Sequence, residues 1–362
     1  MPISLNGTNG LTFNDGSSQA TAARDFGFKN RIINGAMMID QRNAGASVTP
    51  TANPTYTLDR WLYALQQASK MSIQQSTTAP TGFVNSLLAT SLSAYSPLSS
   101  DYHAISQRIE GLNMSDFAWG TASAVTVTLS FWVRSSLTGT FSGSIVNSAA
   151  DRSYPFSYTI SAANTWEQKS VTIAGDTSGT WLTTNGIGAR LFFSLGTGST
   201  YLGTAGAWAS SFYVGSTGSV QPTATNGATF YITGVQLEKG STATSFDYRP
   251  YGTELALCQR YYSRLAGGST YIAHGSGVAI SSTDSFVYIK YPVSMRASPT
   301  STISSLYVYN GVNNYSVSSL NTSYFGIDSA NVRPVASSLT AGQGIVLINN
   351  ASTGYIDFSA EL

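Results

Sequence analysis

The sequence predicts an all-β fold, and three observations support this. The polar residues are mostly Ser, Thr, Asn and Gly, and charged residues make up only 10% of the 362-residue chain, against about 25% in an average soluble domain. This composition is typical of β-sheets joined by many turns. Short apolar runs recur between clusters of Gly, Ser, Thr and Pro, which favours an antiparallel sandwich or jelly roll. A helical pattern occurs at one place only, just after Pro250.

Residues 1–27 form a thin opening segment. In "GLTFNDGSSQATAA", Leu11 and Phe13 alternate with polar residues, and Asp15-Gly16 marks a tight turn. The pattern predicts a strand followed by a turn, but its apolar content is small. Burying so little surface does not offset an ordering cost of about 1–2 kcal/mol per residue. On its own, this segment is therefore not expected to be ordered.

Residues 28–250 are expected to form the antiparallel jelly-roll sandwich. At its start, "FKNRIINGAMMIDQRN" surrounds Asn34-Gly35 with apolar residues and predicts a strand that enters the core. The clearest strand is 125–134, where Val127, Leu129 and Phe131 fall on one face and polar residues on the other. Trp132 is out of place on the polar face. It is either a ligand-binding ring or a ring that packs under a loop or against a neighbouring subunit.

Two further rings, Tyr201 and Trp208, lie in the long Gly-rich stretch "GTGSTYLGTAGAWASSFYVG". Long irregular loops are often functional. Aromatic rings stack on the C–H face of a sugar, and Tyr and Trp add a polar group. Trp132, Tyr201 and Trp208 are therefore candidate carbohydrate-binding residues. The alternative is that the loop rings only pin the loop to the sandwich.

A short helix is expected over residues 251–265, where it links the two β domains. In "YGTELALCQRYYSRL", Glu254 falls in the first turn, where negative charge is stabilising. Arg260 and Arg264 lie toward the C-terminal end, where positive charge is favoured.

Residues 266–362 are expected to form a C-terminal, sandwich-like β domain. Eleven of the 21 tyrosines lie from residue 251 onward. Asn310-Gly311 predicts a hairpin, and the alternation in "LYVYNG" puts Tyr307 and Tyr309 on the face opposite the aliphatic residues. Tyr315, on the returning strand, is expected to join them. These tyrosines are candidate ligand-binding residues at a receptor-binding tip; the alternatives are a buried face or a subunit contact.

Signatures of catalysis are sparse. There is no P-loop, dinucleotide fingerprint or G-x-S-x-G elbow, and the two histidines lack the spacing of a zinc site. Glycoside hydrolysis needs two carboxylates about 5–10 Å apart, and most of those available sit beside turns, where structural roles are usual. They are Glu110, Asp116, Glu167, Asp176, Glu238 and Asp247. We therefore predict that the protein is not an enzyme and assign no catalytic residue.

Charge and cysteine content limit the partners and the compartment. The net charge is +1 without a basic stripe, so nucleic acid is not an expected partner. No apolar run approaches the roughly 18–20 residues that insertion into a membrane needs. No secretory signal is recognisable, and the single Cys258 excludes an intrachain disulfide. Synthesis in a cytoplasm is expected.

Several motifs together resemble those of bacteriophage tail-fibre and other virion fibre proteins. The opening "GLTFNDGSSQATAA" is similar to segments near the start of many tail fibres. The runs "KNRIINGAMMIDQRN", "YTLDRW", "VTLSFWVRSSLTGTF" and "GATFYITGVQLEKGSTATSFDYRPYGTELALCQRYY" resemble a jelly-roll domain of such proteins. The resemblance covers about the first 260 residues and weakens beyond them. It implies a virion component, usually a homotrimer, with a jelly roll similar to carbohydrate-binding modules.

The resemblance implies adhesion to a glycan on the host cell surface, and the C-terminal domain is expected to be the receptor end. In a trimer, three copies of the opening segment would form a stalk that docks to tail or capsid proteins of the particle. The residues expected to pack there are Ile3, Leu5, Leu11 and Phe13. The shared motifs look like fold determinants, so no ligand-contacting residue is transferred. No cofactor is expected apart from structural calcium, which carbohydrate-binding sandwiches often hold, and its ligands are unknown.

Two other functions are compatible with the same sequence. The protein could be a purely structural head fibre, decoration protein or connector of the virion. It could also be a polysaccharide depolymerase, although the sequence has neither a long β-helical repeat nor an identifiable carboxylate cluster. In each case the expected location is the virion, assembled in the host cell.

Overall fold

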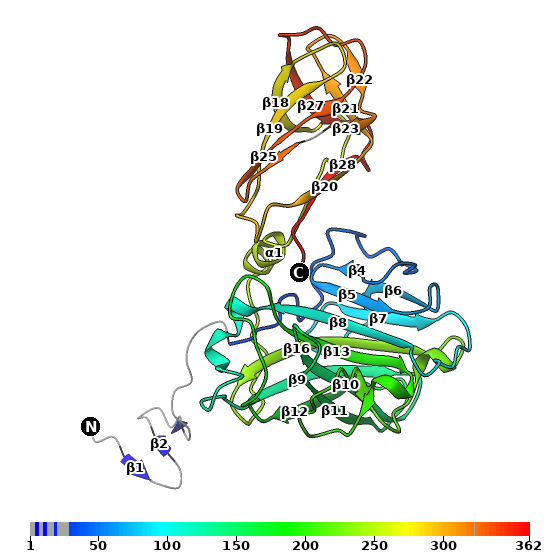
Figure 1. Cartoon of the computed structure of the whole chain (residues 1–362), viewed down its shortest axis with the longest axis vertical. Helices are drawn as coiled ribbons and strands as arrows, with labels where there is room; N and C mark the ends of the chain where they lie inside the picture. Colours follow the sequence, from blue (N-terminus) through cyan, green and yellow to red (C-terminus); the bar gives the residue numbers. More distant parts are fainter. Residues whose placement is uncertain (1–3, 7–9, 13–17, 20–28, 322) are drawn as a thin grey trace.

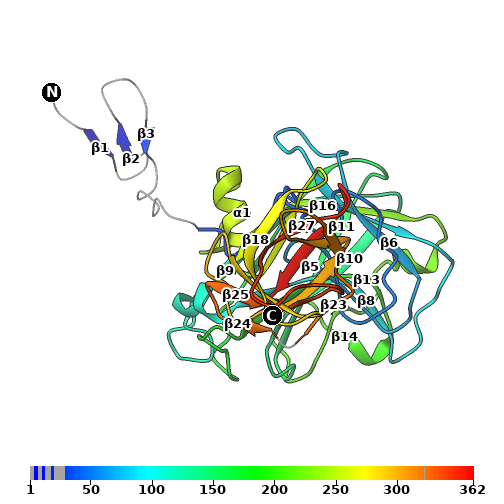
Figure 2. The same ribbon diagram turned by 90° about the horizontal axis from the view of Figure 1, so that it is seen from above.

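The computed structural model describes residues 4–6, 10–12, 18–19, 29–321 and 323–362. Two β domains are stacked along the long axis, with helix α1 (Tyr251–Gln259) at the junction between them (Figure 1). Seen from above, the narrower C-terminal domain lies over the broader first domain (Figure 2). The all-β prediction is confirmed, because α1 is the only α-helix in the described part of the chain. No helix there is long and apolar enough to cross a membrane.

Three short strands lie near the N-terminus: β1 (Ser4–Asn6), β2 (Gly10–Thr12) and β3 (Ser18–Gln19). They form an antiparallel sheet in which the backbone of Leu5 pairs with that of Leu11. Ile3 and Phe13, the other two expected trimer contacts, lie outside the described residues. The trimeric stalk therefore stays a prediction.

The first domain is a sandwich of two antiparallel sheets, with the strand orders β11-β10-β13-β8-β5-β4 and β12-β9-β16-β7-β6. The first sheet contains β4 (Thr55–Leu58), β5 (Trp61–Leu65), β8 (Tyr102–Glu110), β10 (Gly139–Asn147), β11 (Ser153–Ile160) and β13 (Ile187–Thr197). The second contains β6 (Met71–Ser76), β7 (Ser86–Ser91), β9 (Val127–Ser135), β12 (Glu167–Ile173) and β16 (Thr229–Lys239). The core between the sheets is rich in aromatic rings, including Trp61, Phe131, Phe141, Phe193 and Phe230.

The alternation predicted around residues 125–134 is confirmed in β9. Val127, Leu129 and Phe131 are fully buried, because every second side chain of the strand points between the two sheets. Trp132 points to the outer side and is half-buried. The sequence pattern therefore gave the orientation of this strand correctly.

The segment 29–47 differs from the expectation, because it forms turns and irregular structure and no strand. Its apolar residues still enter the core, where Ile32 and Met37 are fully buried. The side-chain amide of Asn34 donates to the carbonyls of Ile39 (2.8 Å) and Asp59 (2.9 Å), and its oxygen accepts the Ile39 N–H (2.9 Å). Asn34 thus satisfies backbone groups that a neighbouring strand would otherwise pair, which hydrophobic patterning does not reveal.

The long loop after β13 is held down on the first domain. It contains the short parallel pair β14 (Leu202–Gly203) and β15 (Gly215–Ser216). Short 3-10 turns occur at Gly111–Asn113, Ser115–Phe117, Ser199–Tyr201 and Pro222–Ala224. The last two of these turns belong to this loop, so the loop is folded rather than extended.

The linking helix is shorter than expected, because α1 ends at Gln259 rather than at residue 265. Arg260 follows the helix directly, whereas Arg264 belongs to strand β17 (Tyr262–Ala266) of the second domain. Strand β17 pairs with β28 (Tyr355–Ser359), which is almost a hundred residues away in the sequence. Because of this pairing, residues 262–265, which the local pattern predicted as the end of the helix, form a strand instead.

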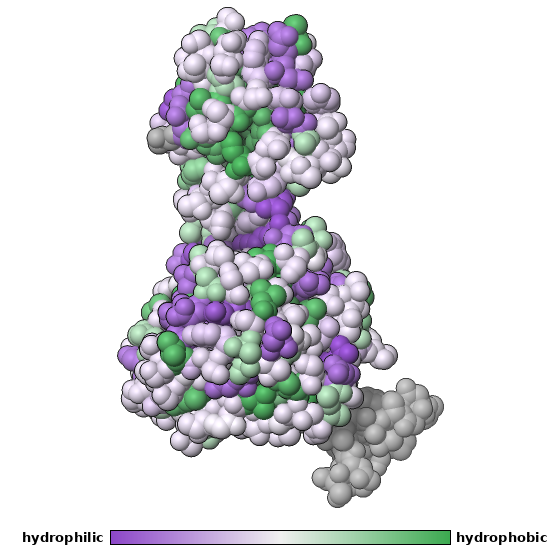
Figure 3. All heavy atoms as spheres, turned by 90° about the vertical axis from the view of Figure 1, so that its right-hand side faces the viewer, coloured by the Kyte–Doolittle hydropathy of each residue, from purple (hydrophilic) through white to green (hydrophobic). Residues whose placement is uncertain are grey.

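Ion pairs connect the two domains at the junction. Arg42 and Arg60 of the first domain form ion pairs with Glu361, and Arg260 forms one with Glu110. Figure 3 shows hydrophilic residues gathered at the narrow waist between the domains. The junction is therefore a polar, closely bonded contact and not a flexible linker.

The second domain is also an antiparallel sandwich. Its seven-stranded sheet has the order β22-β21-β27-β18-β19-β25-β24, and a three-stranded sheet has the order β17-β28-β20. The further strands are β18 (Ala273–Ala279), β19 (Ser285–Lys290), β20 (Thr300–Ser304), β21 (Leu306–Tyr309), β22 (Asn314–Ser316), β24 (Tyr324–Phe325), β25 (Ser329–Val332) and β27 (Gly344–Asn349). Strands β23 (Ser319–Leu320) and β26 (Pro334–Val335) form a small pair. Its buried core includes Val287, Val308, Leu347, Ile356 and Phe358.

Candidate functional site

The outer face of the seven-stranded sheet carries a row of residues, one from each strand. In strand order they are Asn314, Tyr309, Val346, Ser276, Tyr288, Asn331 and Tyr324, each directly opposite the next. Directly opposed residues of antiparallel strands point to the same side of the sheet. The residues that alternate with them, such as Val308, Leu347 and Val287, point into the core. This set, called here the outer row, therefore faces away from the domain core.

The outer row exposes large aromatic rings. Tyr288 is 54% exposed and Tyr324 is 59% exposed. Two strand spacings separate Tyr288 from Tyr324, or about 10 Å, and three separate Tyr309 from Tyr288, or about 14 Å. The row is thus a broad platform rather than a cleft.

A neighbouring ring holds one end of the outer row in place. The rings of Phe286 and Tyr324 are stacked, with centroids 6.1 Å apart and planes at 9°. The guanidinium of Arg333 lies 5.4 Å from the centre of the Phe286 ring and is itself paired with Asp284. These contacts fix the orientation of the Tyr324 ring before any ligand arrives.

Most polar groups of the outer row are available to a ligand, whereas the Tyr309 hydroxyl donates to the carbonyl of Gly311 (2.8 Å). The side chains of Ser276, Tyr288, Asn331 and Tyr324 make no hydrogen bond with another residue that the structure describes. Rings that stack on the C–H face of a sugar therefore alternate with free hydroxyl and amide groups that can bond its hydroxyls. This chemistry suits a neutral, hydroxyl-rich ligand.

Tyr307 and Tyr309 lie on this outer face, as the alternation predicted, and both are half-buried. The predicted hairpin at Asn310-Gly311 joins β21 to β22, and Gly311 has the positive φ of 91° that favours glycine there. Tyr315 is different, because it lies opposite Val308 and packs against the core. The expectation that Tyr315 joins the other two is therefore wrong.

Trp132 lies beside Gly234 on the outer side of β9. Its indole and the ring of Phe83 both lie against Gly234, where an added Cβ would be 2.6 Å from Phe83 and 3.1 Å from Trp132. This contact is compatible with the structural alternative considered for Trp132, and a ligand-binding role for its half-buried ring stays a prediction.

Trp208 and Tyr201 both hold the long loop against the first domain. The indole N–H of Trp208 donates to the carbonyl of Ala174 (2.8 Å), and its ring contacts those of Trp119 and Trp181. Tyr201 contacts the ring of Tyr102 with centroids 5.2 Å apart. These contacts match the pinning role, and a ligand-binding role for either ring stays a prediction.

The carboxylates considered for catalysis are engaged in structural contacts. Asp176 pairs with Arg152 and Glu167 with Lys169, while Glu238 accepts the backbone N–H of Thr244. The remaining partners are Arg260 for Glu110, Arg31 and Lys239 for Asp116, and the Asn30 N–H for Asp247. No three His, Cys, Asp or Glu side chains gather as a metal site within the described ranges. Structural calcium, whose ligands include backbone carbonyls, stays a prediction.

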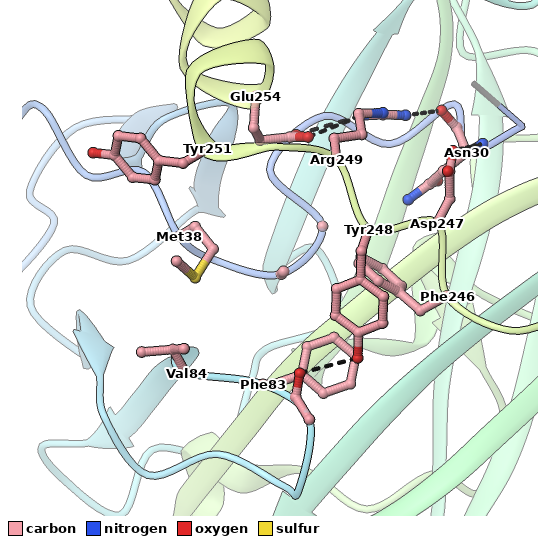
Figure 4. A pocket seen from close by; sticks show the side chains of 13 residues that line it. Asn30, Met38, Phe83, Val84, Phe246, Asp247, Tyr248, Arg249, Tyr251 and Glu254 are labelled. Carbon is pink, nitrogen blue, oxygen red and sulfur yellow. Dashed lines mark hydrogen bonds and ion pairs between the residues drawn. The ribbon is translucent and has the colours of Figure 1, made fainter. Parts of the chain in front are cut away.

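A second site is a pocket of about 180 Å³ beside the start of α1, here called the junction pocket (Figure 4). Its residues come from three separate segments of the chain, which is why sequence patterns did not reveal it. They are Asn30, Gly35, Ala36, Met38, Gly82, Phe83, Val84, Phe246, Asp247, Tyr248, Arg249, Tyr251 and Glu254. Val84, Tyr248 and Tyr251 are each about 60% exposed, so bulky apolar groups stand open to solvent here.

Comparison with known proteins gives structural likenesses only. No family model and no curated protein matches the chain. One similar structure is the enzymatically active domain of tailspike protein 4 of bacteriophage CBA120, with 13% identity and a TM-score of 0.33 over 59% of this chain and 22% of that chain. A candidate sugar-binding protein of Bacteroides thetaiotaomicron has 14% identity and a TM-score of 0.34 over 58% of this chain and 100% of that chain. The family 11 carbohydrate-binding module of Clostridium thermocellum, solved with a mixed-linked tetrasaccharide, has 13% identity and a TM-score of 0.28 over 53% and 100%.

Proposed function

We propose that this chain is an adhesin that binds an extended carbohydrate chain on the outer row of its C-terminal sheet. One observation carries the proposal: Tyr288 and Tyr324 are more than half exposed, although they stand on a sheet whose other face is a complete core. Exposed rings lose apolar burial unless a partner covers them. A ligand that stacks on them recovers that burial.

The pattern of the outer row supports a sugar chain over other partners. Ser276 and Asn331 lie between the rings and have free polar groups. Each exposed ring therefore has a polar group beside it. The row runs across all seven strands of the sheet, and this suits an extended polymer that touches several rings at once. Its residues carry no charge, which disfavours nucleic acid.

Binding of immobilised polysaccharides tests the proposal. The full chain would be applied to an array of bacterial lipopolysaccharides and capsular polysaccharides, beside the variants Tyr288→Ala and Tyr324→Ala. We expect binding to at least one polysaccharide and a loss of about tenfold in each variant. Tyr271→Ala is the matched control, because Tyr271 is 58% exposed on the same domain but outside the outer row.

Two results would contradict the proposal. One is that no polysaccharide binds the wild-type chain. The other is that Tyr271→Ala reduces binding as much as the row variants do. The unfolding free energies of Tyr288→Ala and Tyr271→Ala should agree with the wild type within about 0.5 kcal/mol, because exposed positions rarely affect stability. Tyr324→Ala should lose about 0.5–1.5 kcal/mol, because it removes the stacked contact with Phe286.

We further propose that the chain works as a homotrimeric fibre of a phage particle. The motifs "GLTFNDGSSQATAA" and "KNRIINGAMMIDQRN" support this assignment through their resemblance to virion fibre proteins. Three linked copies would multiply a weak affinity, because the second and third sites bind at high effective concentration. The mass in solution tests the assembly: a trimer has three times the 38.2 kDa of one chain.

Competition with phage particles separates adhesion from a purely structural role. Purified protein should block adsorption of the parent phage to its host, whereas a decoration or connector protein should not. A chain that stays at 38.2 kDa at all concentrations would rule out the trimer.

A further inference from the structure

We propose that the junction pocket is a second carbohydrate site and takes one terminal pyranose ring. This site would extend the adhesion proposed above, but it lies beside α1 and does not depend on the outer row. The junction pocket would bind the terminal sugar of a glycan, whereas the outer row would bind several sugar units along the chain.

The size of the pocket limits its ligand to one ring. Its volume is about 180 Å³, and a protein cavity of about 150 Å³ is known to accept one benzene molecule. A single six-membered ring with its substituents therefore matches the space. A longer oligosaccharide would have to extend from the mouth into solvent.

One wall of the pocket is a rigid aromatic cluster. The rings of Phe83, Phe246 and Tyr248 contact one another with centroids 4.9–5.5 Å apart. The Tyr248 hydroxyl donates to the carbonyl of Gly82 (3.0 Å) and fixes that ring. Figure 4 shows Tyr251 of α1 on the opposite side of the space. Two exposed tyrosine rings thus flank the pocket, in positions where the C–H faces of a pyranose could stack.

The back of the pocket is polar and pre-organised. Glu254 forms an ion pair with Arg249 (3.2 Å) and accepts the backbone N–H of Asn34. One oxygen of Asp247 accepts the Asn30 N–H (3.2 Å), and the other has no partner among the residues described. A carboxylate offers about four acceptor positions, so both acids keep capacity for the hydroxyl groups of a sugar.

The acids decide between a sugar ring and an apolar side chain of another protein. A phenyl or alkyl group in the pocket would remove water from Asp247 and Glu254 without replacing its hydrogen bonds. A pyranose covers the aromatic wall with C–H groups and donates O–H groups to the carboxylates. The Tyr251 hydroxyl makes no hydrogen bond within the described chain and is a third polar group at the site.

Saturation-transfer NMR with the full chain tests the proposal directly. The probes are the methyl α- and β-pyranosides of glucose, galactose, mannose, rhamnose and N-acetylglucosamine. At least one should bind with a dissociation constant in the millimolar range. Tyr251→Ala should weaken that binding about tenfold, since it removes the stacking ring. Val84→Trp, at the rim, should block the pocket without touching the acids.

Tyr271→Ala serves as the matched control, because Tyr271 is equally exposed but does not line the junction pocket. The proposal is overturned if no methyl pyranoside binds the wild-type chain. It is also overturned if Tyr251→Ala and Val84→Trp bind the pyranoside as strongly as the wild type does. It is also overturned if Tyr251 becomes covered when the chain self-associates, which would assign the pocket to a second copy. The outer row is tested with polysaccharides and its own variants, so failure of one test leaves the other proposal standing.

Discussion

Arg60 and Glu361 form an ion pair across the domain junction, with only 1% and 6% of their side chains exposed. The Arg60 guanidinium also lies 3.6 Å from the centre of the Tyr261 ring. A buried charge is stable only when a partner and hydrogen bonds replace its water. Glu361 therefore neutralises the charge of Arg60, which is buried inside the first domain.

Glu361→Ala should destabilise the protein by about 3–5 kcal/mol, because it leaves Arg60 buried without its carboxylate partner. The free energy of unfolding in urea measures this change. Asp116→Ala is the control, since Asp116 pairs with Arg31 and its side chain is 44% exposed. That variant should lose less than about 1 kcal/mol. Equal losses in the two variants would show that the junction pair has no special weight.

Tyr324→Phe should separate stacking from hydrogen bonding on the outer row. The substitution keeps the stacked contact with Phe286 and removes only the hydroxyl group. Loss of one neutral hydrogen bond corresponds to about 0.5–1.5 kcal/mol, or roughly a two- to tenfold weaker affinity. Polysaccharide binding by Tyr324→Phe should thus lie between wild type and Tyr324→Ala. If Phe and Ala behave alike, stacking at Tyr324 contributes nothing.

His103 should make the protein less stable in mild acid. Burial lowers the pKa of His103 from its ordinary 6.5 to about 4, so the folded state keeps it neutral where the unfolded chain binds a proton. Its contribution is present above pH 6.5 and is lost as the pH falls to about 4. Between those values the wild type should lose roughly 3 kcal/mol more than His103→Gln does. Parallel pH profiles for the two proteins would contradict this.

Asp59 should make the protein more stable in mild acid, which is opposite to the effect of His103. Burial raises its pKa from 3.8 to about 6, against the lowering effect of Arg42 and Gln41. The folded state therefore binds a proton more readily, and stability from this group rises as the pH falls from about 6 toward 3.8. Asp59→Asn should abolish that rise. Urea unfolding at several pH values checks both residues, and an unchanged profile in the variant would refute the assignment.

Gly234→Ala should be more harmful than Gly227→Ala, although both glycines have positive φ, 60° and 73°. Gly234 lies at a register shift between β16 and β9, and a Cβ there would meet the Phe83 ring at 2.6 Å. Nothing lies within 4 Å of a Cβ at Gly227. The difference in unfolding free energy should be about 1–3 kcal/mol, the usual cost of overpacking. Equal effects would mean that the Phe83 loop moves away freely.

Local patterns were enough to predict the strands but not their neighbours. The alternation in β9 and the Asn310-Gly311 hairpin are encoded within a few residues and were predicted correctly. The alternation of "SFVYIK" would equally have placed Tyr288 outward, so that signal was present in the sequence. Tyr324 joins the outer row only through Asn331, and that pairing depends on the order of seven strands.

The predicted secondary structure was wrong where tertiary contacts override the local preference of the chain. The segment around Asn34 looked like a strand, but side-chain hydrogen bonds fix it as turns. Residues 262–265 looked helical, but β28 recruits them into a sheet. The junction pocket combines three distant segments and has no local signal at all.

The first strand of the C-terminal domain, β17, lies beside its last, β28, at the waist of the molecule. The polypeptide therefore enters and leaves this domain at one spot. With this layout, another β domain could replace the C-terminal domain while the first domain keeps its fold. The replacement domain would need an acidic residue in the place of Glu361, because Arg60 would otherwise be buried without a partner.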